Sequence, residues 1–272
     1  MSSKNSIHSA LNRRLSITFS RFLIVLILVL SFASYFWQPT TTESWILDIV
    51  SRTCLLFWAG VLAHEAVHGH LGKSRRSNQW WGRLAVVPTA VNFEIFRLTH
   101  LQHHAHTNEA DKDPDYYLNV SPRVLLPIRA IALPHHWLTW LLKQGRLNRK
   151  AKTEYALTYL AYAVIYGGLA WICGWERVLL GLLGSAAANS VILWFFVGTR
   201  AHAGFSTGKP EERTHNYYGA LAYWLTLGLS LHREHHMRPH LSWLEMQSLI
   251  PKGSWWQCLS FQRQIHISHP NN

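Results

Sequence analysis

Residues 155–173 read YALTYLAYAVIYGGLAWIC, and residues 178–199 read VLLGLLGSAAANSVILWFFVGT. Neither run holds a charged side chain, and as a helix each is long enough to cross the roughly 30 Å of hydrocarbon in a bilayer. Only the four residues from Gly174 to Arg177 join the two runs. We therefore expect a tight hairpin of two membrane-spanning helices, which the rest of the chain must accommodate.

Two further apolar runs extend this prediction toward the N-terminus. Residues 17–37 follow basic residues and lack a small-residue cleavage site, so we interpret them as an uncleaved span. Residues 45–64 form a second candidate, although they include Asp48 and Arg52, which are four apart and can pair near the outer interface. Charged residues make up only 15% of the chain, against about 25% in soluble domains. The prediction is an all-α integral membrane protein with about four transmembrane helices and a helical cap.

The distribution of basic residues predicts the orientation of these spans. With four spans, 24 of the 26 Lys and Arg residues fall on the side that carries both termini. Cytoplasmic loops are enriched in Lys and Arg, so we expect both termini to be cytoplasmic. The predicted location is multi-pass in a membrane, with a bacterial inner membrane as our interpretation.

The remaining segments are shorter or interrupted, and no internal repeat organises them. We expect interfacial helices in three of them, at residues 80–96, 125–142 and 217–231. The predicted organisation is a cytoplasmic tail, a single membrane domain and a loose C-terminal tail, at residues 1–16, 17–265 and 266–272.

Three histidine clusters lie on the predicted cytoplasmic side. The first reads HxxxH and the other two read HxxHH, and their members are His64 and His68; His100, His103 and His104; His232, His235 and His236. Positions three and four apart share one face of a helix, so each cluster can aim two or three imidazoles at a common point. Eight imidazoles exceed the four ligands of one zinc ion and suit two metal ions. Imidazole binds zinc, copper, iron and nickel, so the spacing does not choose the metal.

In a four-span protein, this combination of clusters resembles the membrane fatty acid desaturase superfamily, which includes acyl desaturases and carotenoid ketolases and hydroxylases. The matching stretches are residues 64–69, 100–115 (which ends in Asp-Pro-Asp) and 232–243, and the likeness covers residues 45–245. The resemblance implies that two irons are held by nine histidines: His64, His68, His100, His103, His104, His202, His232, His235 and His236. Some members carry an Asn where this chain has Gly198, which leaves the coordination of one iron open, with His215 as a rival to His202.

The resemblance also implies an oxygen-dependent oxidoreductase that acts on an unactivated C–H bond of a lipid chain, with two iron ions as cofactor and molecular oxygen as co-substrate. A fatty acyl desaturase is our first interpretation, and a carotenoid ketolase or hydroxylase, or another lipid hydroxylase, is the alternative. Glu65 favours the desaturase, whereas the short chain and the Asp-Pro-Asp element favour the ketolase. The histidine spacing does not separate them.

Other groups must complete such a site. Acidic side chains commonly orient ligating imidazoles, and four acids are candidates here: Glu65, Asp111, Asp115 and Glu234. Electrons must come from outside because the sequence holds no flavin or haem motif. We expect an external donor, either a ferredoxin or a cytochrome b5-like protein, which the basic cytoplasmic face could attract, although the same face could bind anionic lipid.

Two readings of another class remain. Residues 64–68 spell HExxH, the zinc metalloprotease motif with Glu65 as general base, but this reading leaves both HxxHH clusters idle and no Asp lies in residues 155–199 to supply a third ligand. A metal transporter should place its ligands at the bilayer midplane, where the two long spans carry no ionisable ligand. We do not expect nucleic acid as a partner, because the sequence shows no nucleic-acid-binding module.

Overall fold

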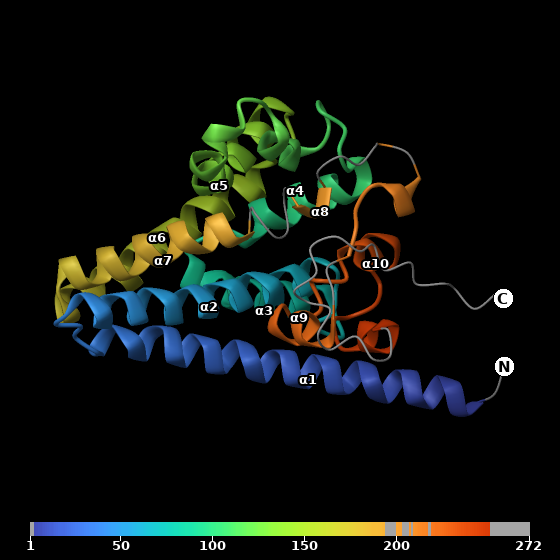
Figure 1. Cartoon of the computed structure of the whole chain (residues 1–272), viewed down its shortest axis with the longest axis horizontal. Helices are drawn as coiled ribbons and strands as arrows, with labels where there is room; N and C mark the ends of the chain where they lie inside the picture. The colour runs from blue at the N-terminus through green and yellow to red at the C-terminus, as the bar shows by residue number, and fades with distance from the viewer. Residues whose placement is uncertain (1–2, 194–199, 203–206, 208, 217–218, 251–272) are drawn as a thin grey trace.

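The computed structural model describes residues 3–193, 200–202, 207, 209–216 and 219–250 (Figure 1). These residues form helices and no β-strand, which confirms the predicted all-α class for the described part of the chain. In chain order, the elements are α1 (Ser3–Ala33), η1 (Ser34–Phe36), α2 (Thr42–Val67), α3 (Arg75–Val86), η2 (Val87–Thr89), α4 (Phe93–His106), η3 (Pro114–Asn119), η4 (Arg123–Leu125), α5 (Leu126–Lys143), α6 (Arg149–Cys173), α7 (Trp175–Leu193), α8 (Arg200–His202), η6 (Pro210–Glu212), α9 (Gly219–Leu225), α10 (His232–Met237) and η7 (Glu245–Leu249).

Four of the described helices are long and apolar enough to cross a membrane, as the sequence predicts. They cover Asn12–Phe36, Thr42–Val67, Arg149–Cys173 and Trp175–Leu193. Residues 194–199, at the end of the fourth predicted span, lie outside the described residues. Residues 266–272, the expected C-terminal tail, lie outside them as well. The expected N-terminal tail is helical from Ser3, so α1 extends well beyond the apolar run.

The spans run side by side, with the α6–α7 turn and the start of α2 at one end (Figure 1). The start of α1, together with α9 and α10, lies at the other end. Gly174 closes α6 with a φ of 93°, a backbone conformation that glycine adopts without steric cost, and α7 begins at the next residue. The predicted tight hairpin is therefore confirmed.

Side-chain caps set the starts of several helices. Thr41 and Ser44 form a capping box at the start of α2, Asn92 caps α4 by accepting from the Ile95 amide, and Asn148 caps α6 in the same way. Each cap supplies a partner to an amide that has none within the helix. These polar residues fix the start of two membrane-spanning helices and of the helix that carries the second histidine cluster.

The prediction of one interfacial helix over residues 80–96 is wrong, because the helix is interrupted between Val86 and Phe93. Pro88, within η2, lacks the amide that would continue α3, and Ala90 adopts a left-handed φ of 53°. The chain then starts again as α4 at Phe93. This break allows α4 to leave the direction of α3 and carry the second histidine cluster toward the end of α2.

A buried ion network ties three helices together near the start of α2, at the end that is far from its histidines. Arg52 Nε lies 3.0 Å from both oxygens of Asp48, which confirms the predicted pair. Arg177 donates to both oxygens of the same carboxylate at 2.8 Å, and also to the carbonyls of Ser34 and Trp37, at the two ends of η1, which directly follows α1. The network therefore clamps α1 and α2 to the start of α7.

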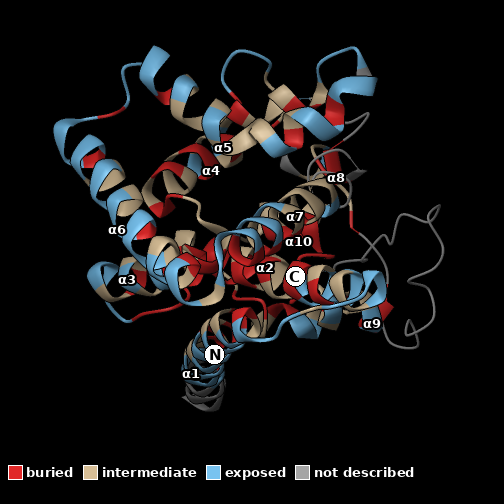
Figure 2. Cartoon of the chain, turned by 90° about the vertical axis from the view of Figure 1, so that its left-hand side faces the viewer, coloured by how far each residue is buried: buried red, intermediate tan, exposed pale blue. Residues whose placement is uncertain are grey.

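Buried residues gather around α2, α4 and α10, whereas α1 and α6 expose much of their surface (Figure 2). The largest apolar core joins α1, α2 and α3 to the segment around α9 and η7. Trp243 is 1% exposed in this core, and its indole nitrogen donates to Ser20 Oγ of α1 at 3.0 Å. This core holds the C-terminal segment, and with it the third histidine cluster, against the bundle.

Candidate metal centre

The end of α2 supplies the first pair of imidazoles. His64 lies one helical turn before His68, so both rings leave the same face of the helix and their centroids are 4.9 Å apart. His64 is buried, and neither of its ring nitrogens has a hydrogen-bond partner. A buried imidazole without a partner is costly, and a bound metal ion would remove that cost.

Two short distances bring the other clusters to this pair. His100 Nε2, on α4, lies 3.1 Å from His68 Nε2 and 3.0 Å from His104 Nε2. His235 Nε2, on α10, lies 3.0 Å from His104 Nε2. The first group therefore joins imidazoles from all three clusters.

A second group lies beside the first. His202 Nε2 is 2.9 Å from His232 Nε2, which is 3.2 Å from His236 Nε2. The two groups touch, because the rings of His104 and His236 stack with centroids 4.1 Å apart. The first group holds His64, His68, His100, His104 and His235, and the second holds His103, His202, His232 and His236.

All nine predicted histidines thus lie together, but the clusters divide in a way that the spacing does not reveal. The pairs four residues apart stay together: His100 with His104, and His232 with His236. The middle histidine of each HxxHH cluster belongs to the other group: His103 lies with His232 and His236, and His235 lies with His100 and His104. Each HxxHH cluster therefore aims two imidazoles at one group, within the expected two or three, because a residue three positions on leaves the opposite edge of the helical face.

The nitrogen spacing tests whether the groups could hold metal ions. Two imidazole nitrogens bound to one ion at about 2.0–2.1 Å lie about 2.9 Å apart at a right angle and about 3.4 Å apart at a tetrahedral angle. The closest pairs of Nε2 atoms here are separated by 2.9–3.2 Å. The donor set fits metal ions, and five donors in one group exceed the four of a tetrahedral site.

Burial keeps most of these imidazoles in the form that binds metal. Loss of hydration lowers the pKa of His68 and of His232 to about 3, with nearby imidazoles adding to the shift. The same causes lower the pKa of a further five well below the usual value: His100, His104, His202, His235 and His236. Neutral imidazole has a free lone pair, so the groups are ready to accept a cation.

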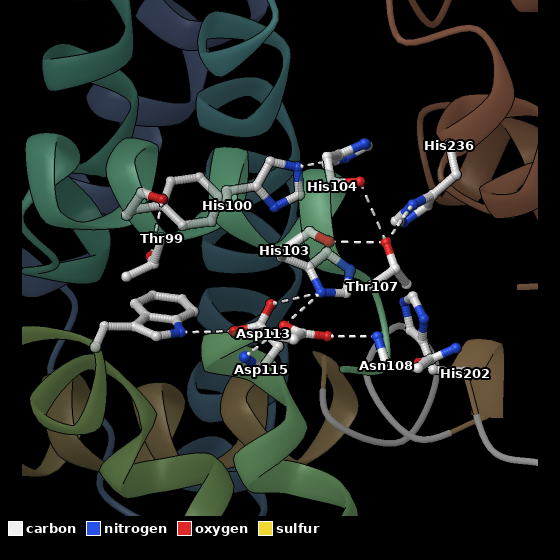
Figure 3. A network of polar contacts seen from close by, with 12 residues as sticks. Thr99, His100, His103, His104, Thr107, Asn108, Asp113, Asp115, His202 and His236 are labelled. Atoms are coloured by element: carbon white, nitrogen blue, oxygen red, sulfur yellow. Dashed lines mark hydrogen bonds and ion pairs between the residues drawn. The ribbon is translucent and has the colours of Figure 1, made fainter. Parts of the chain in front are cut away.

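His103 differs because a carboxylate supports it (Figure 3). Its Nδ1 lies 2.9 Å from Asp113 Oδ1. Burial lowers the pKa of His103, but the charge and hydrogen bond of Asp113 outweigh it and raise the pKa to about 9. Asp113 also accepts from the amides of Asn108 and Asp115, which fix its orientation. With Nδ1 held by the carboxylate, Nε2 is the atom left for a metal ion.

The candidate acids named from the sequence omit Asp113, and the structure places them as follows. Asp111 is exposed, whereas Asp115 Oδ2 lies 3.8 Å from His103 Nδ1. Neither Glu65 nor Glu234 belongs to a histidine group. The signal that could have found Asp113 is its place inside the Asp-Pro-Asp element, two residues from Asp115.

Glu65 instead anchors the C-terminal segment. Its Oε2 accepts from His70 Nδ1 and from the amide of Trp243, each at 3.0 Å. Burial alone would lower the pKa of His70, but Glu65 raises it, so the pair is held by charge as well as by the hydrogen bond. These contacts give Glu65 a structural task that the HExxH protease interpretation does not predict.

His202, and not His215, contributes to the second group. His202 is 5% exposed, and α8 directs it at His232. His215 lies nearby, and its amide donates to the Ala201 carbonyl at 3.1 Å, but it is in neither group. Gly198, the position of the departure from the family pattern, lies outside the described residues.

The sequence model described as "Fatty acid desaturase" matches residues 43–269, so the chain belongs to that family. It is 38% identical over 63 residues to the sn-1 acyl-lipid omega-3 desaturase (ferredoxin) of Synechocystis sp., which covers 23% of this chain and 18% of that protein. It is 23% identical over 205 residues to the zeaxanthin 4-ketolase of Chlamydomonas reinhardtii, covering 68% of this chain and 39% of that protein.

A beta-carotene 4-ketolase of Protosiphon botryoides is also 23% identical, over 225 residues that cover 77% of this chain and 53% of the ketolase. The chain therefore spans about a fifth to a half of the length of the curated relatives it matches. With its four candidate spans, this member of the desaturase family is a membrane protein.

Proposed function

We propose that the chain is a membrane oxidoreductase that uses two iron ions and molecular oxygen to oxidise an unactivated C–H bond of a lipid chain. One observation carries this proposal: two adjoining groups of buried or half-buried imidazoles, five and four in number, include no carboxylate among the described residues. Five nitrogen donors do not suit tetrahedral zinc, whereas imidazole serves iron well. The family relationship favours the same metal.

In this proposal the nine histidines hold the two ions, and Asp113 keeps the His103 ring in the orientation and tautomer that exposes Nε2. Bound iron would supply the reduction of oxygen and the oxidation of the C–H bond. The buried positions of His64, His103 and His235 keep bulk water from the site. The substrate reaches the site from the bilayer, through which the four apolar helices pass.

Fatty acyl desaturation is the first reaction that we propose. Its support is the 38% identity to an acyl-lipid desaturase, although that match covers only 23% of this chain. Carotenoid ketolation or hydroxylation is the second candidate, and the extent of the ketolase matches, 68% and 77% of the chain, favours it. Both reactions need the same ligands, so substrate placement decides between them.

The proposal includes an external electron donor and an orientation. A ferredoxin or a cytochrome b5-like protein would supply the electrons at the cytoplasmic end, where we place both termini and the histidine groups. The name of one relative includes a ferredoxin. The excess of basic residues outside the spans favours this orientation in a bacterial inner membrane.

The deciding experiment is lipid and pigment profiling of a bacterial host that expresses the chain, with and without a carotene pathway. New double bonds in phospholipid acyl chains would establish desaturation. A shift of carotene to keto- or hydroxy-carotenoids with unchanged acyl chains would establish the second candidate. The proposal would be overturned if neither the acyl chains nor the carotenoids of the host changed and the purified protein held no iron.

A further inference from the structure

Trp137, on α5, contacts both histidine groups through one neighbour each. Its Nε1 donates to Asp115 Oδ1 at 2.7 Å, and Asp115 Oδ2 lies 3.8 Å from Nδ1 of His103 in the second group. On the other side, its ring lies 5.5 Å from the ring of Phe96, which lies 5.5 Å from the His100 ring of the first group. The half-buried indole thus connects the outer helix α5 to both candidate metal positions.

The chain around Trp137 is strongly basic. Residues 116–153 contain seven Lys and Arg residues and no Asp or Glu. Four of the basic side chains follow Trp137 closely and are exposed: Lys143, Arg146, Arg149 and Lys150. The first acidic residue after them, Glu154, is engaged by Arg83 at 2.8 Å. This cluster, which we call the basic turn, therefore presents an uncompensated positive charge.

We propose that α5 and the basic turn dock an acidic, soluble one-electron carrier protein, and that its electrons enter the centre through Trp137. This inference rests on the proposed di-iron function. In each encounter the reduced carrier loses one electron, and two encounters reduce the two iron ions from the ferric to the ferrous state. Anionic lipid would also bind the basic turn, but it would give no reason for the contacts from Trp137 to both groups.

Docking is tested with ferric protein in nanodiscs of neutral phosphatidylcholine, mixed without oxygen or substrate with a reduced [2Fe–2S] ferredoxin. A triple variant, Lys143→Ser with Arg146→Ser and Arg149→Ser, should lower the bimolecular rate of ferredoxin oxidation about tenfold or more and weaken its salt dependence. The matched control changes Lys73, Arg75 and Arg76 to Ser, which removes the same number of exposed positive charges at and just before the start of α3. This control should keep the wild-type rate.

Electron entry is tested at saturating ferredoxin, where docking no longer limits the rate. Trp137→Leu should slow the first-order reduction of the ferric centre severalfold. Trp140→Leu is the control, because Trp140 packs in the same small core one turn along α5, whereas the hydrogen bond to Asp115 and the ring contact with Phe96 belong to Trp137. Arg146 of the basic turn lies over the Trp140 ring, so the comparison requires saturating ferredoxin. Reduction by dithionite, a small reductant, should be equal in all variants. If Trp137→Leu holds no iron, the same comparison is made with Phe variants, and the ferric centre of Trp137→Phe must be reduced more slowly than that of Trp140→Phe.

A wild-type rate in Trp137→Leu, or equal losses in the two triple variants, would overturn the inference. So would a basic-turn variant that reacts normally with ferredoxin and loses only its binding to anionic vesicles, because the segment would then serve lipid. Failure of the proposed function looks different: the purified protein would hold no centre that dithionite can reduce.

Discussion

Asp113 Oδ1 lies 2.9 Å from His103 Nδ1, with both side chains buried, and this contact supports a ring of the second histidine group. Asp113→Asn should lower metal affinity by about 10–100-fold, because the amide carries no charge to orient and polarise the imidazole. Chelator competition on purified protein measures the change. Asp111→Asn is the control, since Asp111 is exposed, and equal affinities in the two variants would contradict the assignment.

One ligand from each group tests the division of the histidines. His235→Ala removes a donor from the first group and His236→Ala removes one from the second. Each variant should lose the activity and retain less metal than the wild type, as measured by elemental analysis per folded protein. His240→Ala, which changes an exposed histidine four residues after His236, should retain both the activity and the metal content of the wild type. Full activity in either ligand variant would refute the site.

Acid should destabilise the metal-free protein. Burial lowers the pKa of His68 and His232 to about 3, against about 6.5 in an unfolded chain. Between these values the unfolded state binds more protons, so stability is present above pH 6.5 and falls with decreasing pH, by on the order of 1–2 kcal/mol per histidine at pH 5. The measurement is the thermal unfolding midpoint in detergent at pH 7 and pH 5.

His103 contributes with the opposite sign to this pH dependence. Asp113 raises the pKa of His103 to about 9, so its contribution is full below pH 6.5 and is lost as the pH rises through 9. Replacing His68 and His232 by Gln should make the fall in folding stability below pH 6.5 shallower. A midpoint that stays constant from pH 7 to pH 5 in the unaltered chain would rule out buried, neutral imidazoles.

The ion network at the far end should affect stability and spare the metal site. Asp48→Asn leaves Arg52 and Arg177 buried without a carboxylate, which should cost about 3–5 kcal/mol. His64 lies 16 residues further along α2, about 24 Å away, so metal content per folded molecule should not change. Thermal unfolding and elemental analysis together give the answer. Glu176→Gln changes an exposed acid beside Arg177 and should alter neither.

The sequence predicts several elements of the fold because their causes are local. An uncharged run of 19 residues such as 155–173 is long enough to cross a membrane as a helix, and Gly174 can turn the chain after it. The pair of Asp48 and Arg52 follows from helical spacing alone. Other features needed distant partners: the capture of Asp48 by Arg177 depends on how α7 packs, and the helix expected at 80–96 ends early at Pro88.

The sequence by itself determined that nine histidines could gather at one end of the bundle, because spans and helical spacing place them there. Only the tertiary structure decided how they divide, since His103 and His235 each lie in a different group from the other two histidines of their cluster. The same holds for Asp113, which reaches His103, and for Trp137, which reaches Asp115, only once η3 and α5 pack against α4. Spacing fixes which face of a helix a side chain leaves, but its partners depend on the helices that pack against that face.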